Sequence, residues 1–291
     1  MSRIGFIGLG MMGQPMAHLL HAAGHPLVVR DVNAEATRRF VAGHAGALAA
    51  SDAASFSDCD IVLTMLPDSD IVDAVLAELA PHLKAGASVI EMSSADPSRT
   101  RALAARLAEH DVSLIDAPVS GGVKKAVAGT LAIMVGGDPA VHERLKPVLE
   151  VMGKQITHVG PVGSGHALKA LNNYVSAAAL IATAEAIHAG AAFGIDPATI
   201  VDVINASTGK NNTTENKAHQ FMLNGAFNSG FSLALQAKDV GIAASLGPAL
   251  GVPMTLAQKV SDLTTLASGK LGPAADHTEL YSFAALSLIH I

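Results

Sequence analysis

Three glycines near the start of the chain restrict its fold more than any other feature. Gly8, Gly10 and Gly13 form a G-x-G-x-x-G pattern directly after a short apolar run and at the head of a helical pattern. In this setting the first glycine permits a tight turn, the second lets the backbone approach a pyrophosphate, and the third lets helix and strand pack closely. The helix N-terminus adds free N–H groups and a partial positive charge. The pattern therefore predicts a dinucleotide site on this loop, which also carries Met11 and Met12.

An acidic residue lies at the distance that such a site requires. Asp31 is 18 residues past Gly13, at the end of the next β-branched run, LVVRD. A carboxylate there can accept hydrogen bonds from the adenosine ribose 2′-OH and would repel a 2′-phosphate. Arg30 precedes it, but side chains alternate along a strand, so the two residues should point to opposite faces. We therefore expect NAD rather than NADP.

Apolar runs alternate with helical patterns through the first half of the chain. The runs fall at residues 4–8, 27–29, 61–66, 88–92, 113–115 and 131–135. Strands that alternate with short helices predict βαβ units and a parallel sheet. Ligands of a doubly wound sheet bind at the carboxyl ends of its strands. Met65, Leu66, Pro67 and Ser94 follow two of the runs and are thus placed to line the cofactor.

The pattern changes near residue 160. The Ala- and Leu-rich stretch from 165 to 194 has no proline and no internal glycine until Gly190, which predicts a helix of more than twenty residues. Further helical patterns follow at 197–206, 214–223, 233–246 and 254–267, and no strand is expected. We expect a doubly wound α/β domain over residues 1–160 and an all-helical substrate and oligomerisation domain over 161–285. The uncharged run 240–258 contains several glycines and prolines, so we interpret it as helix, turn and helix rather than a membrane span.

Composition excludes several classes of function. The net charge is −6, tryptophan is absent and aromatics make up 3%, so nucleic-acid binding has little electrostatic or stacking basis. Cys59 is the single cysteine, which excludes an internal disulfide and fits a reducing cytosol. The sequence shows no zinc-ligand spacing and no signal peptide, and we expect no metal, no membrane association and a cytoplasmic location. Residues 286–291 (LSLIHI) resemble a translated sequencing adapter, so the position of the native C-terminus is left open.

Two groups of residues carry candidate chemistry. Lys169 and Asn173 are spaced i, i+4 on the expected long helix and so share one face. Desolvation lowers the pKa of a lysine toward neutrality and makes it a usable general acid, although a surface lysine fits the spacing equally. Ser120, Gly121 and Gly122 form a turn whose N–H groups and hydroxyl suit a carboxylate ligand, but an ordinary glycine-rich loop has the same sequence.

Together these motifs resemble the β-hydroxyacid dehydrogenase family, which includes 3-hydroxyisobutyrate dehydrogenase and tartronate semialdehyde reductase. The resemblance runs from Ile4 to about 276–278. The matching segments are IGFIGLGMMGQPMA at the start, MLP at Met65–Pro67, DAPVSGG at Asp116–Gly122, GTLAIMVGG at Gly129–Gly137, GSGHALKALNN at Gly163–Asn173 and Lys238-Asp239.

The resemblance implies a Rossmann domain and a helical domain joined by one long helix. It also implies NAD(P)-dependent oxidation of a 3-hydroxy acid, or the reverse reduction. The site residues that it implies are Lys169 as the catalytic lysine with Asn173 as its companion, Ser120, Gly121 and Gly122 at the substrate carboxylate, Met65, Leu66 and Ser94 at the cofactor, and Lys238 over the nicotinamide with Phe231 nearby.

The chain departs from the family near the expected substrate region. Residues 123–126 do not continue toward Gly-Ala, His166 stands where Gln is common, and 207–217 lacks an aromatic. A 3-hydroxyisobutyrate-like substrate is favoured, and tartronate semialdehyde or a threonate-type acid stays open. A dinucleotide-binding module without catalysis is the alternative from another class, but Lys169 is present and no basic tail exists.

The second half of the chain also predicts self-association. The stretch Tyr174–Ala192 is apolar around most of its helical circumference, more than a small domain can bury. We expect a homodimer or homotetramer that packs through the helical domain, with a small hydroxy acid as the other partner.

Overall fold

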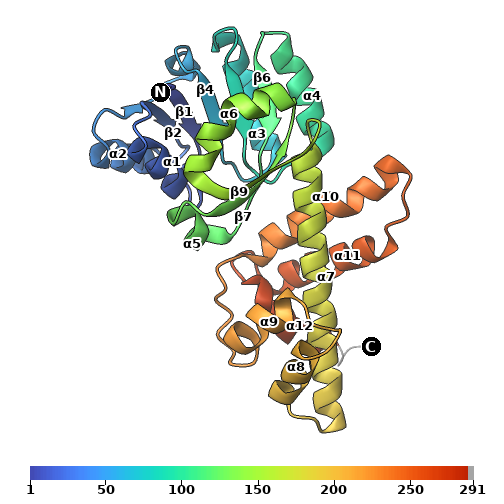
Figure 1. The fold of residues 1–291 in the computed structure, drawn as a ribbon. Helices are drawn as coiled ribbons and strands as arrows, with labels where there is room; N and C mark the ends of the chain where they lie inside the picture. Colours follow the sequence, from blue (N-terminus) through green and yellow to red (C-terminus); the bar gives the residue numbers. More distant parts are fainter. Residues whose placement is uncertain (288–291) are drawn as a thin grey trace. The chain divides into compact units, whose positions relative to one another are not determined.

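The computed structural model describes residues 1–287, so most of the LSLIHI segment lies outside the described residues. The chain forms two compact units, Met1–Lys169 and the part from Ala170 onward (Figure 1). The predicted boundary at 160/161 precedes the long helix α7 (Ser164–Phe193), whereas the first compact unit includes the first turns of that helix.

The first unit is built on one nine-stranded sheet. Its strand order is β3-β2-β1-β4-β5-β6-β8-β7, and β9 pairs with β8. Neighbours from β3 to β6 are parallel, while β8 is antiparallel to both β6 and β7 and parallel to β9. The strands are β1 (Ile4–Ile7), β2 (Leu27–Arg30), β3 (Leu48–Ala49), β4 (Ile61–Thr64), β5 (Ser88–Glu91), β6 (Ser113–Asp116), β7 (Val119–Ser120), β8 (Leu131–Gly136) and β9 (Gly153–Gly160).

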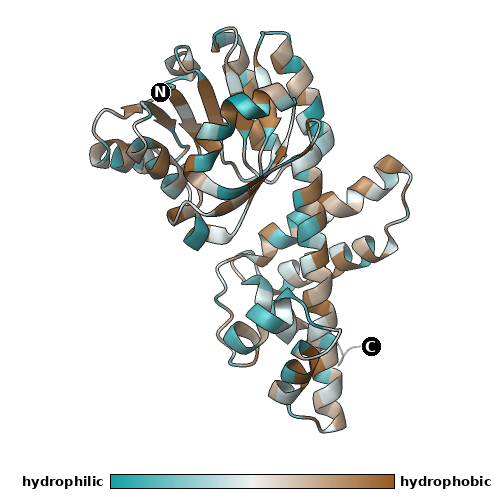
Figure 2. Cartoon of the chain, viewed as in Figure 1, coloured by the Kyte–Doolittle hydropathy of each residue, from teal (hydrophilic) through white to brown (hydrophobic). Residues whose placement is uncertain are grey.

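Helices cover both faces of this sheet because its central strands are apolar on both sides (Figure 2). In β1, Phe6 packs into the core shared with α1, α2, α5 and α6, and the next residue, Ile7, packs into the core shared with α3 and α4. The helices of this unit are α1 (Gly13–Ala22), α2 (Ala34–Gly43), α3 (Ser69–Leu79), α4 (Pro97–Ala108), α5 (Gly122–Val127) and α6 (Pro139–Met152), with short 3₁₀ turns at Ala53–Phe56 and Ala80–His82.

The strand order places a topological switch point beside β1. Chain connections leave β1 toward β2 on one side, and the strand on its other side is β4. Ligands of open α/β sheets bind outside the carboxyl ends of the strands at such a point. The glycine loop directly follows β1, so the fold puts the predicted dinucleotide site where this architecture binds ligands.

The described elements of the second unit are helices, apart from one isolated bridge between Ser232 and Asp276. After α7 they are α8 (Pro197–Asn205), α9 (Asn212–Asn216), a π-helical turn (Ala218–Met222), α10 (Leu233–Leu250), α11 (Thr255–Leu271), a 3₁₀ turn (His277–Glu279) and α12 (Leu280–Ser287). The predicted fold class, a doubly wound sheet followed by an all-helical domain, is confirmed.

Two predictions about this unit can be compared with the structure directly. The run 240–258 is indeed helix, turn and helix, because α10 ends at Gly251 in a left-handed conformation and α11 begins at Thr255. The continuous helix expected over 214–223 is wrong. Asn211 starts α9 early with a capping box, and the backbone of Lys217 (φ −125°) separates α9 from the π-helical turn.

Among residues 1–287, α7 is the one helix long and apolar enough to cross a membrane by length and composition alone. Central helices of soluble domains can have the same length and composition, so this observation alone is weak evidence for a membrane span.

Candidate active site

The three glycines of the loop after β1 have different surroundings. Gly8 has φ +101°, and a Cβ there would lie 2.2 Å from the carbonyl oxygen of Met65. A Cβ at Gly13 would lie 1.8 Å from the carbonyl oxygen of Gly8. At Gly10, by contrast, no heavy atom of the described residues would come within 4 Å of a Cβ. The fold itself therefore requires Gly8 and Gly13, whereas Gly10 borders open space that a ligand can fill.

The N-terminus of α1 differs from those of four other helices of this unit, although α5 also begins without a side-chain cap from a described residue. Helices α2, α3, α4 and α6 each begin at an Asn or Asp whose side chain accepts a first-turn N–H. At α1 the capping position is Met12, and no side chain in the described part of the chain caps it. Met12 packs against the core, and Met11 is exposed. Donors without a side-chain acceptor, beside an open Gly10, fit a pyrophosphate.

Asp31 lies directly against this loop. Its Oδ2 accepts a hydrogen bond from the amide of Leu9 at 2.6 Å, and its Oδ1 accepts one from the amide of Asn33 at 2.8 Å. Arg30 instead pairs with Glu78 of α3, with 3.0 Å between Nη1 and Oε1. The carboxylate and the guanidinium are thus engaged in different places, as expected from strand alternation.

The loops that follow β4 and β5 are joined by Ser93, which directly precedes Ser94. The amide of Leu66 donates to Ser93 Oγ at 2.8 Å, and Ser93 is buried. Met65 and Leu66 each pack on one of the two cores, while Pro67 is exposed and Ser94 is half-buried. The structure therefore brings the Met65–Pro67 loop and Ser94 together at the carboxyl edge of the sheet.

The Ser-Gly-Gly turn joins β7 to α5. Ser120 is the last residue of β7 and is half-buried. Gly121 is the N-cap of α5, Gly122 is its first residue, and both are exposed. Their positive φ angles, +134° and +68°, suit glycine. This arrangement leaves the turn accessible at the end of the strand.

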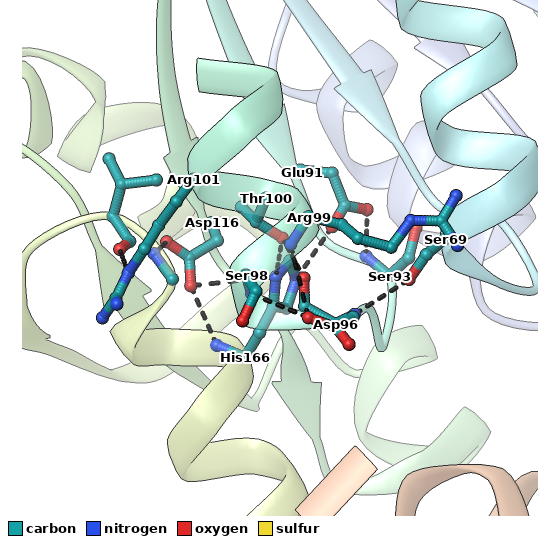
Figure 3. A network of polar contacts seen from close by, with 12 residues as sticks. Ser69, Glu91, Ser93, Asp96, Ser98, Arg99, Thr100, Arg101, Asp116 and His166 are labelled. Carbon is teal, nitrogen blue, oxygen red and sulfur yellow. Dashed lines mark hydrogen bonds and ion pairs between the residues drawn. The ribbon is translucent and has the colours of Figure 1, made fainter. Parts of the chain in front are cut away.

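Buried ionisable side chains attach the head of α7 to the sheet (Figure 3). Asp116, the last residue of β6, accepts hydrogen bonds from the amides of Gly163 (2.7 Å) and His166 (2.8 Å) and so caps α7. The His166 ring reaches Glu91, the last residue of β5, with 2.8 Å between Nε2 and Oε2. Lys169 follows His166 by three residues on the same helix and is half-buried.

This cluster was not predicted. Asp116 entered the sequence argument only as part of DAPVSGG, and His166 was expected near the substrate region. The His166 side chain is instead 0% exposed, as is that of Glu91, so it faces the interior of the first unit.

Charge pairing shifts the pKa values in this cluster. Burial by itself would lower the pKa of His166, but the Glu91 carboxylate, with help from Asp116, raises it above the ordinary value. Burial would raise the pKa of Glu91, but the nearby charge of His166 lowers it. Burial raises the pKa of Asp116 despite its two amide donors.

Two candidate residues of the second unit, Asn173 and Lys238, lie against a buried aspartate. Asn173 Nδ2 donates to Asp239 Oδ2 at 2.6 Å. Lys238 Nζ lies 3.5 Å from Asp239 Oδ1. Phe231 packs edge-on against His277, with 5.5 Å between ring centroids. Asp239 therefore holds the amide of Asn173 in one orientation, and it was not predicted to do so.

Comparisons with known proteins identify the family. Residues 3–160 match the NAD-binding domain of 6-phosphogluconate dehydrogenase, and residues 163–284 match the NAD-binding domain of NADP-dependent 3-hydroxyisobutyrate dehydrogenase. The chain is 39% identical over 257 residues to 2-(hydroxymethyl)glutarate dehydrogenase of Eubacterium barkeri, covering 87% of this chain and 85% of the relative. It is 34% identical over 291 residues to 2-hydroxy-3-oxopropionate reductase of Escherichia coli, covering 99% of both.

A solved structure is similar over nearly the whole length. Mycobacterium tuberculosis 3-hydroxyisobutyrate dehydrogenase with L-serine matches with a TM-score of 0.91 at 32% identity, covering 97% of this chain and 99% of that one. The glycine loop at the switch point, the helical second unit and these relatives together show that the chain belongs to the β-hydroxyacid dehydrogenase family.

Proposed function

We propose that this protein is an NAD-dependent oxidoreductase that interconverts a short-chain 3-hydroxy acid and its semialdehyde. The observation that carries the proposal is the carboxyl edge of the sheet. There Gly10, which borders open space, and the N-terminus of α1, which has no side-chain cap, lie beside Asp31. At the same edge Asp116, at the end of β6, binds the first turn of α7, the helix that carries Lys169. The bound nicotinamide would supply the hydride acceptor.

Lys169 is assigned the proton transfer. In the oxidation its amine accepts the proton of the substrate hydroxyl as the hydride leaves the carbinol carbon. In the reduction its ammonium returns that proton to the developing alkoxide. Asn173, oriented by Asp239, would hold the lysine or the substrate oxygen in place. Such positioning, together with charge stabilisation, is the contribution that a protein makes to hydride transfer.

The substrate carboxylate is assigned to the turn of Ser120, Gly121 and Gly122. The Ser120 hydroxyl and the N–H groups of this accessible turn are the kind of donors that a carboxylate needs. The cofactor is assigned to the glycine loop with Met11 and Met12, and to Asp31, Met65, Leu66, Pro67 and Ser94 in the first unit. Phe231 and Lys238 would contribute from the second unit.

NAD is favoured over NADP for two reasons. Asp31 presents a carboxylate beside the loop, where it would repel a 2′-phosphate. Arg30 is paired with Glu78, and the residue after Asp31 is the exposed Val32 rather than a cation.

The identity of the hydroxy acid is the open part of the proposal. The named substrates of similar proteins differ in size and charge, from 3-hydroxyisobutyrate to 2-(hydroxymethyl)glutarate and 2-hydroxy-3-oxopropionate. Steady-state assays of a panel of these acids, L-serine, threonate and the semialdehydes, with NAD and NADP separately, test the proposal. Turnover of one member with NAD supports it, and dinucleotide binding without any turnover would favour a non-catalytic module.

We also propose a cytoplasmic homo-oligomer. Only 28% of the most apolar 18-residue stretch of α7 is buried within the chain, and Val175 and Phe193 are 62% and 87% exposed. A second copy packed on this helix would cover them.

Cys59 is buried and free, and burial raises its pKa to about 11, which fits a reducing compartment.

A further inference from the structure

The His166 ring lies between hydrogen-bonding groups that determine its charge. On one side, Nδ1 is 2.9 Å from Thr100 Oγ1. The Thr100 hydroxyl donates its proton to the carbonyl oxygen of Asp96 at 3.0 Å. A hydroxyl that donates to this carbonyl can only accept from Nδ1, and in that arrangement Nδ1 carries a proton.

On the other side, Nε2 faces a carboxylate. Glu91 Oε2 lies 2.8 Å away, at ion-pair distance, and neither atom has a hydrogen-bond partner among the described residues. The second oxygen of Glu91, Oε1, accepts the amide of Ser93 at 2.8 Å, which favours the ionised form. An ionised carboxylate only accepts, so Nε2 carries a proton as well. Both ring nitrogens are then protonated.

The cluster joins three elements at one point. Glu91 and Asp116 are neighbours in register at the ends of β5 and β6. Asp116 caps α7 through the amides of Gly163 and His166, and its Oδ2 is also 3.9 Å from His166 Nδ1. The network thus fixes both the backbone and a side chain of the first turn of α7.

We propose that His166 is a buried imidazolium that positions Lys169, by fastening the first turn of α7 to the ends of β5 and β6 through Glu91 and Asp116. His166 does not touch the substrate in this role. Its positive charge offsets a carboxylate whose burial alone would be costly, and the rigid helix transmits that anchoring to Lys169, three residues later.

The other charged groups around the head of α7 have their own partners. Arg101 of α4 donates Nε to the carbonyl oxygen of Val162, and the Asp96 carboxylate caps α4 by accepting from the amides of Ser98 and Arg99. Arg99 pairs with Asp70 and Asp73 of α3. Glu91 and Asp116 are therefore the anions that bear on the His166 charge.

The protonation state can be measured without any substrate. In protein labelled with ¹⁵N-histidine, long-range ¹H–¹⁵N correlation distinguishes an imidazolium from either neutral tautomer, and His166→Gln assigns the signals. We expect His166 to stay cationic at about pH 8, well above the ordinary histidine pKa of about 6.5. A neutral His166 ring at about pH 7 would overturn the proposal.

Glu91→Gln tests the link to Lys169. Without the carboxylate, burial lowers the pKa of His166, so the ring loses a proton that the parent retains when the pH is raised from about 5.5 to about 8. We expect kcat of this variant to fall by about tenfold to 100-fold over that range, beyond any change in the parent protein, because the head of α7 shifts. The Glu91→Gln, His166→Gln double variant pairs two neutral amides and should lose this extra pH dependence. A merely structural role would not create a histidine-like titration in kcat.

This inference rests on the proposed role of Lys169, and one measurement distinguishes a failure of the inference from a failure of the proposed function. Hydrogen exchange of the amides at 163–169, compared between Glu91→Gln and the parent at the same pH, should quicken near pH 8 and match near pH 5.5. His142→Gln, at another buried histidine of the same unit, is the control and should not change exchange there. If exchange and NMR behave as expected but no substrate turns over, only the proposed function fails. If Glu91→Gln leaves both the exchange and the pH profile unchanged, His166 does not position Lys169.

Discussion

Adding one methyl group to the glycine loop should separate its structural role from its binding role. In Gly13→Ala the new Cβ would lie 1.8 Å from the Gly8 carbonyl oxygen, whereas carbon and oxygen need at least about 3.3 Å. The loop or α1 must therefore move by about 1.5 Å, and overpacking of this kind costs about 1–3 kcal/mol. For a unit of this size that lowers Tm by about 2–12 °C.

For Gly10→Ala we predict the opposite result, unchanged stability and weaker NAD binding. No heavy atom of the described residues lies within 4 Å of its Cβ, so the free energy of unfolding should stay within about 0.5 kcal/mol of the parent. The methyl would instead fill the space assigned to the pyrophosphate, and Kd for NAD should rise at least about tenfold, or 1.4 kcal/mol. Gly43→Ala, at another open glycine of the same unit, is the control for both measurements.

Calorimetric unfolding without cofactor and isothermal titration with NAD measure the two effects. Tight NAD binding by Gly10→Ala would show that the pyrophosphate does not approach this glycine. An unchanged Tm for Gly13→Ala would show that the loop does not pack on α1 as described.

Three further predictions follow from other parts of the structure. Lys169→Ala should lower kcat by about 10²- to 10⁴-fold with little change in Kd for NAD. Lys169→Arg should lower kcat as well, because arginine does not release its proton near neutral pH. Near-normal kcat in the arginine variant would mean that Lys169 supplies positive charge and no proton transfer. Asp31→Ser combined with Val32→Arg should shift the ratio of kcat/KM values toward NADP by at least about tenfold, and an unchanged ratio would remove Asp31 from cofactor selection. Burial lowers the pKa of Lys217 to about 8, although the charge of Asp276 opposes this shift. Between pH 8 and the ordinary lysine pKa of about 10.4, the unfolded chain therefore binds more protons at Lys217 than the folded chain does. Over this pH range the contribution of Lys217 to the free energy of unfolding rises with pH. Urea unfolding near pH 7 and 9.5 should show that Lys217→Met loses this rise, and equal slopes in parent and variant would contradict the assignment.

The sequence predicted those parts of the fold that local patterns encode. The glycine motif with Asp31 placed the loop at the switch point, and the absence of proline after 165 predicted α7. Strand β9 was missed because Gly153–Gly160 is largely polar and not fully buried, and it is held by pairing with β8 rather than by its own pattern.

The buried cluster at the head of α7 could not be predicted for a related reason. Asp116 and His166 are 50 positions apart, and no local pattern records that a strand end and a helix head meet. His166 stood out in the sequence only because it replaces a common Gln, which suggested a place near the substrate. The chemistry of its neighbours, visible only once the chain is folded, assigns it to the interior.

The most direct test of the central claim follows one deuterium atom. A 3-hydroxy acid from the panel, deuterated at the carbinol carbon, is oxidised with NAD, and the reduced dinucleotide is analysed by mass spectrometry. Direct hydride transfer predicts one deuterium in the reduced nicotinamide for each semialdehyde formed. Loss of the deuterium to water, or semialdehyde formed without reduction of the dinucleotide, would contradict it.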